Sequence, residues 1–219
     1  KIVTASFLYA NKTGTIFKKE VKSGLTIRAA VKYENADTDL FIKYEPEGKL
    51  FYLETSLKNF ALKKLGIIPV SMQKYLPEFT VETLTIKYAN KEQTVNNVKV
   101  KHGFTINGKV NIGSSSTDIK ITQETDTQFT LVELDVNSVN FGEFVPQNII
   151  PSHMKDLFSK ISIPHASLRY ANKSAVHDGK KVYQGIHIEG NMRFGENTGS
   201  LVFIYSDADK ILSLNAKLS

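Results

Sequence analysis

Tyr88-Ala89-Asn90-Lys91 is one of three copies of the same four residues, because Tyr-Ala-Asn-Lys also stands at Tyr9 to Lys12 and at Tyr170 to Lys173. The three copies are spaced by about 80 residues, and self-similarity at such a fixed interval indicates a repeat architecture. Fifteen residues after each Tyr, a glycine opens a run of alternating apolar and polar residues. The landmarks of the predicted repeat are Tyr9, Asn11, Gly24, Tyr88, Asn90, Gly103, Tyr170, Asn172 and Gly185.

A further landmark fixes the length of the repeat. Ile67-Ile68-Pro69, with Met72 after it, returns as Ile149-Ile150-Pro151, with Met154 after it, and this shift equals the one from Tyr88 to Tyr170. We therefore predict three units, 1–78, 79–160 and 161–219, of which the last is truncated. Since the array is cut at both ends and the first residue is Lys1, we interpret the chain as an excerpt of a larger protein.

Each unit reads mainly as antiparallel strands. In the run opened by Gly24, the apolar Leu25, Ile27 and Ala29 alternate with polar or small residues. This period of two predicts a strand with one apolar, buried face and one polar, solvent-exposed face. Such alternation is typical of antiparallel sheets. We count five strands in a unit: the Tyr strand, a short strand around Ile16 (Val95 and Val182 in the other units), the Gly strand, and two strands joined by a tight turn.

Between units the apolar spacing changes to three or four, which predicts short amphipathic helices. Phe60, Leu62 and Leu65 carry this spacing, and so do Met72, Tyr75 and Leu76. Because an odd number of strands reverses the chain, we expect the helical link to cross the sheet and to cover part of its apolar face. The predicted fold is mainly β: tandem repeats of about 80 residues, each a five-stranded antiparallel meander followed by a helical crossing segment, stacked into an elongated curved sheet.

Composition excludes several classes of protein. The 219 residues are 41% hydrophobic and 23% charged, as in ordinary globular domains, and no apolar run approaches the length of a membrane span. The chain has no Cys, so a disulfide framework, a thiolate metal site and a Cys nucleophile are excluded. The net charge of +6 is dispersed without a long basic run or a recognition motif, so we predict no nucleic-acid partner.

The search for catalytic and metal motifs returns nothing specific. His102, His153, His165, His177 and His187 lack the spacing of a helical metal pair, and Ser114-Ser115-Ser116 lacks the context of a nucleophile elbow. Asp37 with Asp39, and Asp207 with Asp209, lack the rest of a calcium loop. We therefore predict no catalytic, cofactor or metal site and no enzyme. Asn11 and Asn172 begin glycosylation sequons, although turn chemistry alone explains them.

The predicted apolar face leaves two alternatives open, a filled core or a groove for a ligand. Its aromatic residues include Tyr33, Tyr44, Phe104, Phe129, Phe194 and Tyr205. In strand count and crossing link, the unit resembles the repeating β-groove modules of bridge-like lipid transfer proteins. That resemblance concerns architecture and implies a lipid ligand on the dry face.

The preferred functional hypothesis is a non-enzymatic tandem-repeat β segment of a larger protein, which serves as an elongated scaffold or binding surface. Its expected partner is another protein or the flanking repeats of the parent chain. The first alternative is a β-groove module that carries lipid or another hydrophobic ligand. The second is an accessory domain of a larger enzyme or toxin.

Overall fold

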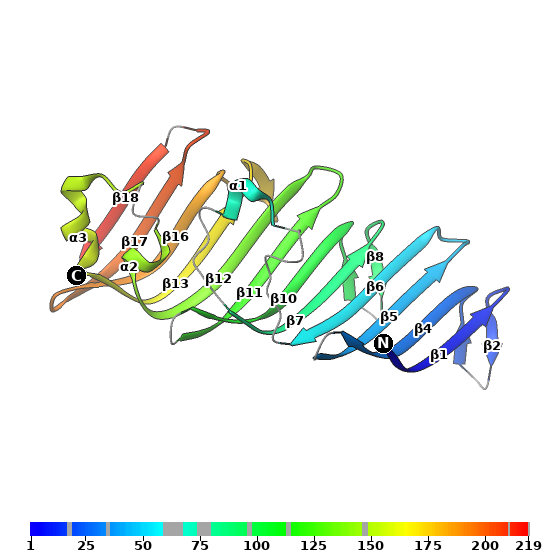
Figure 1. Ribbon diagram of the computed structural model, residues 1–219. Coiled ribbons are helices and arrows are strands. Elements are labelled where there is room, and N and C mark those ends of the chain that lie inside the picture. The colour runs from blue at the N-terminus through cyan, green and yellow to red at the C-terminus, as the bar shows by residue number, and fades with distance from the viewer. Residues whose placement is uncertain are drawn as a thin grey trace.

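Twelve strands form one open antiparallel sheet in the computed structural model (Figure 1). The structure describes residues 1–16, 19–33, 36–58, 68–73, 80–95, 98–112, 115–145, 149–209 and 211–218. The strands of the sheet, in their spatial order, are β1 (Ile2–Ala10), β4 (Gly24–Tyr33), β5 (Ala36–Glu45), β6 (Leu50–Lys58), β7 (Thr80–Ala89), β10 (Gly103–Ile112), β11 (Ser115–Glu124), β12 (Phe129–Asn140), β13 (Ile161–Ala171), β16 (Gly185–Phe194), β17 (Asn197–Ser206) and β18 (Ile211–Leu218).

Three small hairpins stand apart from this sheet. They are β2 (Gly14–Ile16) with β3 (Lys19–Val21), β8 (Gln93–Val95) with β9 (Val98–Val100), and β14 (Ala175–His177) with β15 (Lys180–Val182). The prediction of five sheet strands per unit was therefore wrong, because each predicted unit has four strands in the sheet and the expected second strand lies in a hairpin. The strands on either side of each hairpin pair directly with each other, so the hairpin is left out of the ladder between them.

The prediction that the link between units must cross the sheet was also wrong. Strands β6 and β7 are antiparallel neighbours, with Lys58 opposite Thr83, and β12 and β13 are likewise neighbours, with Asn140 opposite Ser162. Each link therefore leaves and re-enters at the same end of the sheet. The four sheet strands of each predicted unit already bring the chain back in the right direction, so no reversal is needed.

The sheet has one apolar face with a continuous core. Side chains alternate between faces along a strand, while directly paired residues of neighbouring strands share a face. One row of paired residues runs across six neighbouring strands, and all its members are buried: Ile86, Ile106, Ile121, Val132, Tyr170 and Ile186. They belong to one large hydrophobic cluster that extends from Leu57 to Phe203.

The segments between β6 and β7 and between β12 and β13 contribute described residues that cover part of this apolar face. Their described helical pieces are short: α1 (Val70–Gln73), α2 (Phe141–Phe144), the 3₁₀ turn η2 (Ser152–Met154) and α3 (Lys155–Ser159). Ile68 and Met72 join the core, and the Phe141 ring lies 4.9 Å from that of Phe158 and 5.2 Å from that of Phe203 on β17. The expected covering role is thus observed for these pieces, whereas Phe60, Leu62, Leu65, Tyr75 and Leu76 lie outside the described residues.

None of the helices within the described ranges is long and apolar enough to cross a membrane.

The glycines that open β4, β10 and β16 are required by their backbone geometry. Gly24, Gly103 and Gly185 have φ of +127°, +117° and +99°. A Cβ atom at Gly103 would lie 2.0 Å from the carbonyl oxygen of Gln123 on β11, and the other two glycines face similar contacts. Only glycine accepts both the positive φ and this close approach, which explains why it recurs fifteen residues after each Tyr.

Candidate functional site

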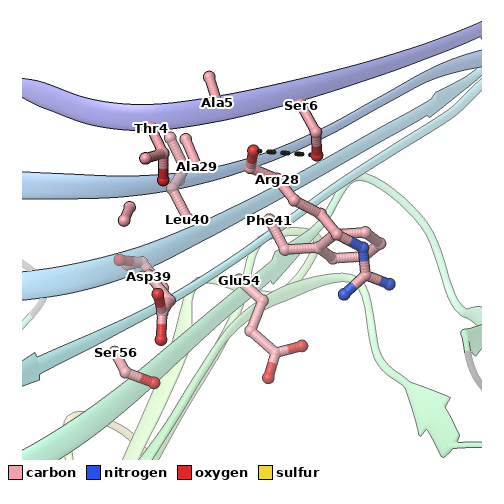
Figure 2. Close-up of a pocket in the computed structure, with 12 residues that line it drawn as sticks. Thr4, Ala5, Ser6, Arg28, Ala29, Asp39, Leu40, Phe41, Glu54 and Ser56 are labelled. Carbon is pink, nitrogen blue, oxygen red and sulfur yellow. Dashed lines mark hydrogen bonds between the residues drawn. The ribbon is translucent and has the colours of Figure 1, made fainter.

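Two clefts lie on the polar face of the sheet, opposite the core. The first has a volume of about 720 Å³ and lies over β1, β4, β5 and β6 (Figure 2). Its polar lining comes from Thr4, Ser6, Arg28, Asp39, Glu54 and Ser56. These residues stand at alternate positions on their strands, so the period of two in the sequence places them together on one face.

An Arg side chain and an aromatic ring organise the first cleft. The guanidinium carbon of Arg28 lies 4.8 Å from the centre of the Phe41 ring, a cation–π contact, and Figure 2 shows the two side chains lying alongside each other. The Ser6 hydroxyl donates to the Arg28 carbonyl oxygen at 3.4 Å. Glu54 accepts a hydrogen bond of 2.6 Å from the Tyr52 hydroxyl and lies 3.6 Å from Lys87 Nζ. Burial, and then this bond to Glu54, raises the pKa of the Tyr52 phenol.

The second cleft, of about 690 Å³, carries more charge. Its charged lining consists of Lys109, Asp118, Lys120, Glu133, Asp135 and Arg169, from β10, β11, β12 and β13. Glu133 lies 3.3 Å from Lys120 Nζ and 3.6 Å from Arg169 Nε, so one carboxylate holds two cations. Asp118 and Asp135 are directly opposite each other on neighbouring strands, and both are exposed.

The two clefts occupy equivalent positions in the chain. The shift in numbering that carries Tyr9 to Tyr88 also converts most of the lining of the first cleft into that of the second: Thr4 to Thr83, Ser6 to Thr85, Arg28 to Asn107, Asp39 to Asp118, Glu54 to Glu133 and Ser56 to Asp135. The carboxylates are kept, whereas Arg28 is replaced by Asn107. Strands β4 and β10 are four places apart in the sheet, so the clefts repeat at about 19 Å.

A smaller cavity of about 250 Å³ lies beside the second cleft, with Lys101 and the β14–β15 hairpin contributing to its wall. Lys101 Nζ donates to Asp178 at 2.8 Å, and this bond, followed by the charge of His177, lowers the pKa of Asp178. The His177 ring is buried 5.6 Å from the Phe129 ring and lies 3.4 Å from a Glu124 oxygen. The hairpin is thereby fixed to the polar face.

The Asn of the tetrapeptide at Tyr88 to Lys91 bonds the start of β6 and the turn before it. Asn90 accepts a hydrogen bond from the Phe51 amide at 2.8 Å and donates to the Lys49 carbonyl at 3.0 Å, and Lys91 Nζ donates to the Gly48 carbonyl. The side chain thus continues the β6–β7 ladder into the turn that precedes β6. We call this arrangement the seam clamp.

The second seam clamp has the same bonds. Asn172 accepts from the Thr130 amide at 2.8 Å and donates to the Gln128 carbonyl at 2.9 Å, and Lys173 Nζ donates to the Thr127 carbonyl. The Asn172 amide is therefore committed within the fold. Sequence reasoning placed a turn at this Asn but missed that its side chain bonds the start of β12 and the turn before it.

The Tyr landmarks lie in three different environments. Tyr9 is exposed near the end of β1, Tyr88 is partly buried with its ring 4.7 Å from that of Phe104, and Tyr170 is fully buried, which raises the pKa of its phenol. Each Tyr ends a sheet strand with the following Ala. Tyr9 is the most exposed of the three because β1 has a neighbour on one side, whereas β7 and β13 have a neighbour on both sides.

The aromatic residues predicted on the apolar face do not all lie there. Phe104, Phe194 and Tyr205 pack against the main core. Tyr44 is 46% exposed. Phe129 belongs to a separate cluster with Leu131, Ala171 and Val182, under the β14–β15 hairpin, because its position in β12 points it to the opposite face. The side chain of Tyr33 lies outside the part of the chain that the structure describes.

Within the described residues, no group of three or more His, Asp or Glu is arranged to hold a metal ion. His102 Nδ1 lies 2.9 Å from Asp126, and His165 Nδ1 lies 2.9 Å from Asn137 Oδ1. Burial, and then the positive charge of Arg169, lowers the pKa of His187. Ser114 and the side chains of Ser115 and Asp37 lie outside the described residues.

Sequence reasoning did not identify the polar clefts. A signal was present, because Asp39 and Glu54 return as Asp118 and Glu133 at the offset of the first two tetrapeptides. These carboxylates are exposed or partly exposed on strands, so they resemble an ordinary solvated face until their strands are aligned.

Compared with known proteins, the chain matches no family model, no curated protein and no solved structure.

Proposed function

We propose that this chain is a non-enzymatic binding scaffold, built of tandem units over 1–78, 79–160 and 161–219, which presents its polar face to a protein partner. The repeat is supported by the order of elements. From each of β1, β7 and β13 the chain runs through one sheet strand, one hairpin and three further sheet strands. Equal seam clamps at Asn90 and Asn172 support it further.

The observation that carries the proposal is the recurrence of the polar cleft at one spacing. Two clefts of similar volume, about 720 and 690 Å³, lie about 19 Å apart on one face of a continuous sheet. The opposite face is largely filled by its own core and by the links between units. An elongated partner can therefore contact both clefts at once, and the second contact gains from a high effective concentration.

The charges of the clefts favour a polypeptide over a polyanion. The second cleft has three cations, Lys109, Lys120 and Arg169, and three carboxylates, so its side chains sum to zero. The first cleft has Arg28 against Asp39 and Glu54, a sum of −1. A polyanion gains affinity mainly from net positive charge, which neither cleft provides. A peptide segment with charges of both signs is complementary to both.

A peptide display library of extended linear segments tests this function. At about 3.3 Å per residue, roughly six residues span the distance between the clefts, so a library of about twelve residues is long enough to contact both. We expect selected peptides to carry charges of both signs. Arg28→Glu and Lys120→Glu should each weaken their binding at least tenfold, while Lys217→Glu, on the last strand, serves as the control. Selected peptides that bind all three variants equally would refute the proposal.

A second candidate, a hydrophobic-ligand carrier, is favoured by the first unit alone. There Ile27, Ile42 and Leu53, paired in one row on the apolar face, are only partly buried, whereas the corresponding face of β10 to β16 is covered. Native mass spectrometry of the purified chain tests it: co-purifying acyl chains would support this candidate. A spectrum of the bare polypeptide, with no uptake of added fluorescent fatty acid, would remove it.

A further inference from the structure

The cavity of about 250 Å³ beside the second cleft continues that cleft along the strands, and we call it the recess. Asn107 and Lys120 line both hollows, and they are directly paired on β10 and β11. Two residues further along each strand, Lys87, Thr105 and Thr122 form the next paired row on the same face. The recess therefore begins where the second cleft ends, about 7 Å along the strands.

The recess collects positive charge, unlike the two clefts. Lys87, Lys101 and Lys120 line it from β7, from the residue after β9 and from β11. The carboxylate among its lining residues is that of Asp178, at the tip of the β14–β15 hairpin. With His177 neutral, three lysines against one carboxylate sum to +2, whereas the clefts sum to zero and −1. This cavity is the size of one compact group and not of a length of chain.

The lysines have more donors than their ion pairs use. Lys87 Nζ lies 3.6 Å from Glu54 and Lys120 Nζ lies 3.3 Å from Glu133, and neither carboxylate lines the recess. An ammonium group has three N–H donors, so one ion pair leaves two for another oxyanion. A ligand in the recess can therefore be bound without breaking these two ion pairs.

A buried histidine also lines the recess. The side chain of His177 is 7% exposed, and its Nδ1 makes no hydrogen bond to the described residues, although a Glu124 oxygen lies 3.4 Å away. Buried polar atoms in folded chains nearly always have a hydrogen-bond partner, so an exception points to a further group that binds nearby.

Asp178 shows how an anion is held at this place. Lys101 Nζ donates a hydrogen bond of 2.8 Å to its carboxylate. That bond, and then the charge of His177, lowers the pKa of Asp178, which is the effect of a positive local potential. The side chain of Asp178 is 63% exposed, so it is free to turn outward when a stronger anion takes its place beside Lys101.

We propose that the recess binds a phosphoryl group on a serine or threonine of the protein partner that occupies the second cleft. The inference rests on the proposed function, because it takes the polar face as the surface that meets the partner. A phosphate monoester carries a charge of about −2 at pH 7 and three acceptor oxygens, which match a lining of +2 with three lysines. A carboxylate has a smaller charge and two oxygens, so it matches the recess less well.

The recess is particular to the middle of the sheet. At the offsets between the tetrapeptides, Lys120 corresponds to Phe41 in the first predicted unit and to Val202 in the third. An apolar side chain at that position cannot bind an oxyanion. We therefore expect the described residues to bind one phosphoryl group per chain.

Titration with a blocked phosphoserine, N-acetylphosphoserine methylamide, tests the recess without any peptide. Chemical-shift changes by NMR should centre on the amides of Thr105, Thr122 and Asp178 and should saturate at one probe per chain. Lys101→Ala and Lys120→Ala should each weaken binding about tenfold, the effect of one charge-assisted hydrogen bond. Asp178→Asn should strengthen it about threefold, because an exposed competing carboxylate is removed.

Lys181→Ala is the matched control, because this exposed lysine lies on the same hairpin and does not line the recess. It removes the same charge and should leave the affinity unchanged. Blocked glutamate should bind about tenfold more weakly than blocked phosphoserine. The proposal would be overturned by equal affinity for the two probes, by equal losses in Lys101→Ala and Lys181→Ala, or by the lack of saturable binding.

Peptides separate this inference from the proposed function. A peptide selected on the clefts should bind about tenfold more tightly when it carries a phosphoserine that reaches the recess. If selected peptides bind but phosphorylation at no position adds affinity, the phosphoryl site is refuted and the scaffold function stands. If blocked phosphoserine binds the recess but no peptide is selected, the scaffold function is refuted and the phosphoryl site stands.

Discussion

Replacing Asn90, the residue after β7, by alanine removes one hydrogen bond to β6 and one to the turn that precedes β6, while the packing of the strands stays intact. The bonds measure 2.8 Å to the Phe51 amide and 3.0 Å to the Lys49 carbonyl. A neutral hydrogen bond contributes a net of about 1 kcal/mol to stability. The free energy of unfolding should therefore fall by about 2 kcal/mol, equivalent to about 4–8 °C in Tm for a chain of this size.

The chain supplies its own control in Asn11, which stands in the same tetrapeptide but follows β1, a strand that among the described residues pairs with β4 alone. Asn11→Ala should change the free energy of unfolding by less than about 0.5 kcal/mol, as a surface substitution does. Asn172→Ala should match Asn90→Ala, because its bonds of 2.8 and 2.9 Å are the same in kind.

Urea denaturation measures the free energy of unfolding of all three variants. Hydrogen exchange adds a local reading, since the Phe51 amide should lose protection in Asn90→Ala before the amides of β10 do. Equal losses for Asn11→Ala and Asn90→Ala would refute the reasoning, because the effect would then belong to the tetrapeptide itself and not to the seam.

Three further substitutions test the fold by urea denaturation. Gly103→Ala should lower the free energy of unfolding by about 2 kcal/mol or more, because the residue has a positive φ and a carbonyl oxygen would lie 2.0 Å from the new Cβ. Its control is Gly14→Ala, where the new Cβ meets nothing within 4 Å, and this change should be nearly neutral. Phe158→Ala should cost about 3–5 kcal/mol through the cavity it leaves in the core, and Leu157→Ala, at a residue 42% exposed, less than about 1 kcal/mol. Burial lowers the pKa of His187 in the folded protein, so the unfolded chain binds the proton first as the pH drops through 6.5. The free energy of unfolding should therefore fall between pH 7.5 and 5.5, and His187→Gln should make this fall smaller.

The alternation of residues predicted the strands well. The runs after Gly24, Gly103 and Gly185 begin strands at these glycines, and the paired strands downstream form the expected hairpins. Periodicity reports which face a residue occupies, which is a local property of the backbone. It does not report which strands are neighbours, so the short strand around Val95 was assigned to the main sheet although it pairs only with β9.

For a related reason, the polar clefts could not be predicted from local sequence patterns. Glu54 and Lys87 are far apart in the chain but directly opposite in the sheet, as Glu133 and Arg169 are. Nothing in either segment identifies its partner. Once the register of β6 and β7 is known, however, the recurrence of the same carboxylates in the second cleft follows from the sequence.

The sequence by itself determined the strand positions, the polar and apolar faces, and the glycines that open three strands, because side-chain alternation and a positive φ are properties of a few consecutive residues. Only the tertiary structure decided that these strands form one continuous sheet, that Asn90 bonds the start of β6 and the turn before it, and that Phe129 lies on the polar side. Each of these depends on contacts between segments tens of residues apart, whose register is fixed when the apolar rows of neighbouring strands are buried together.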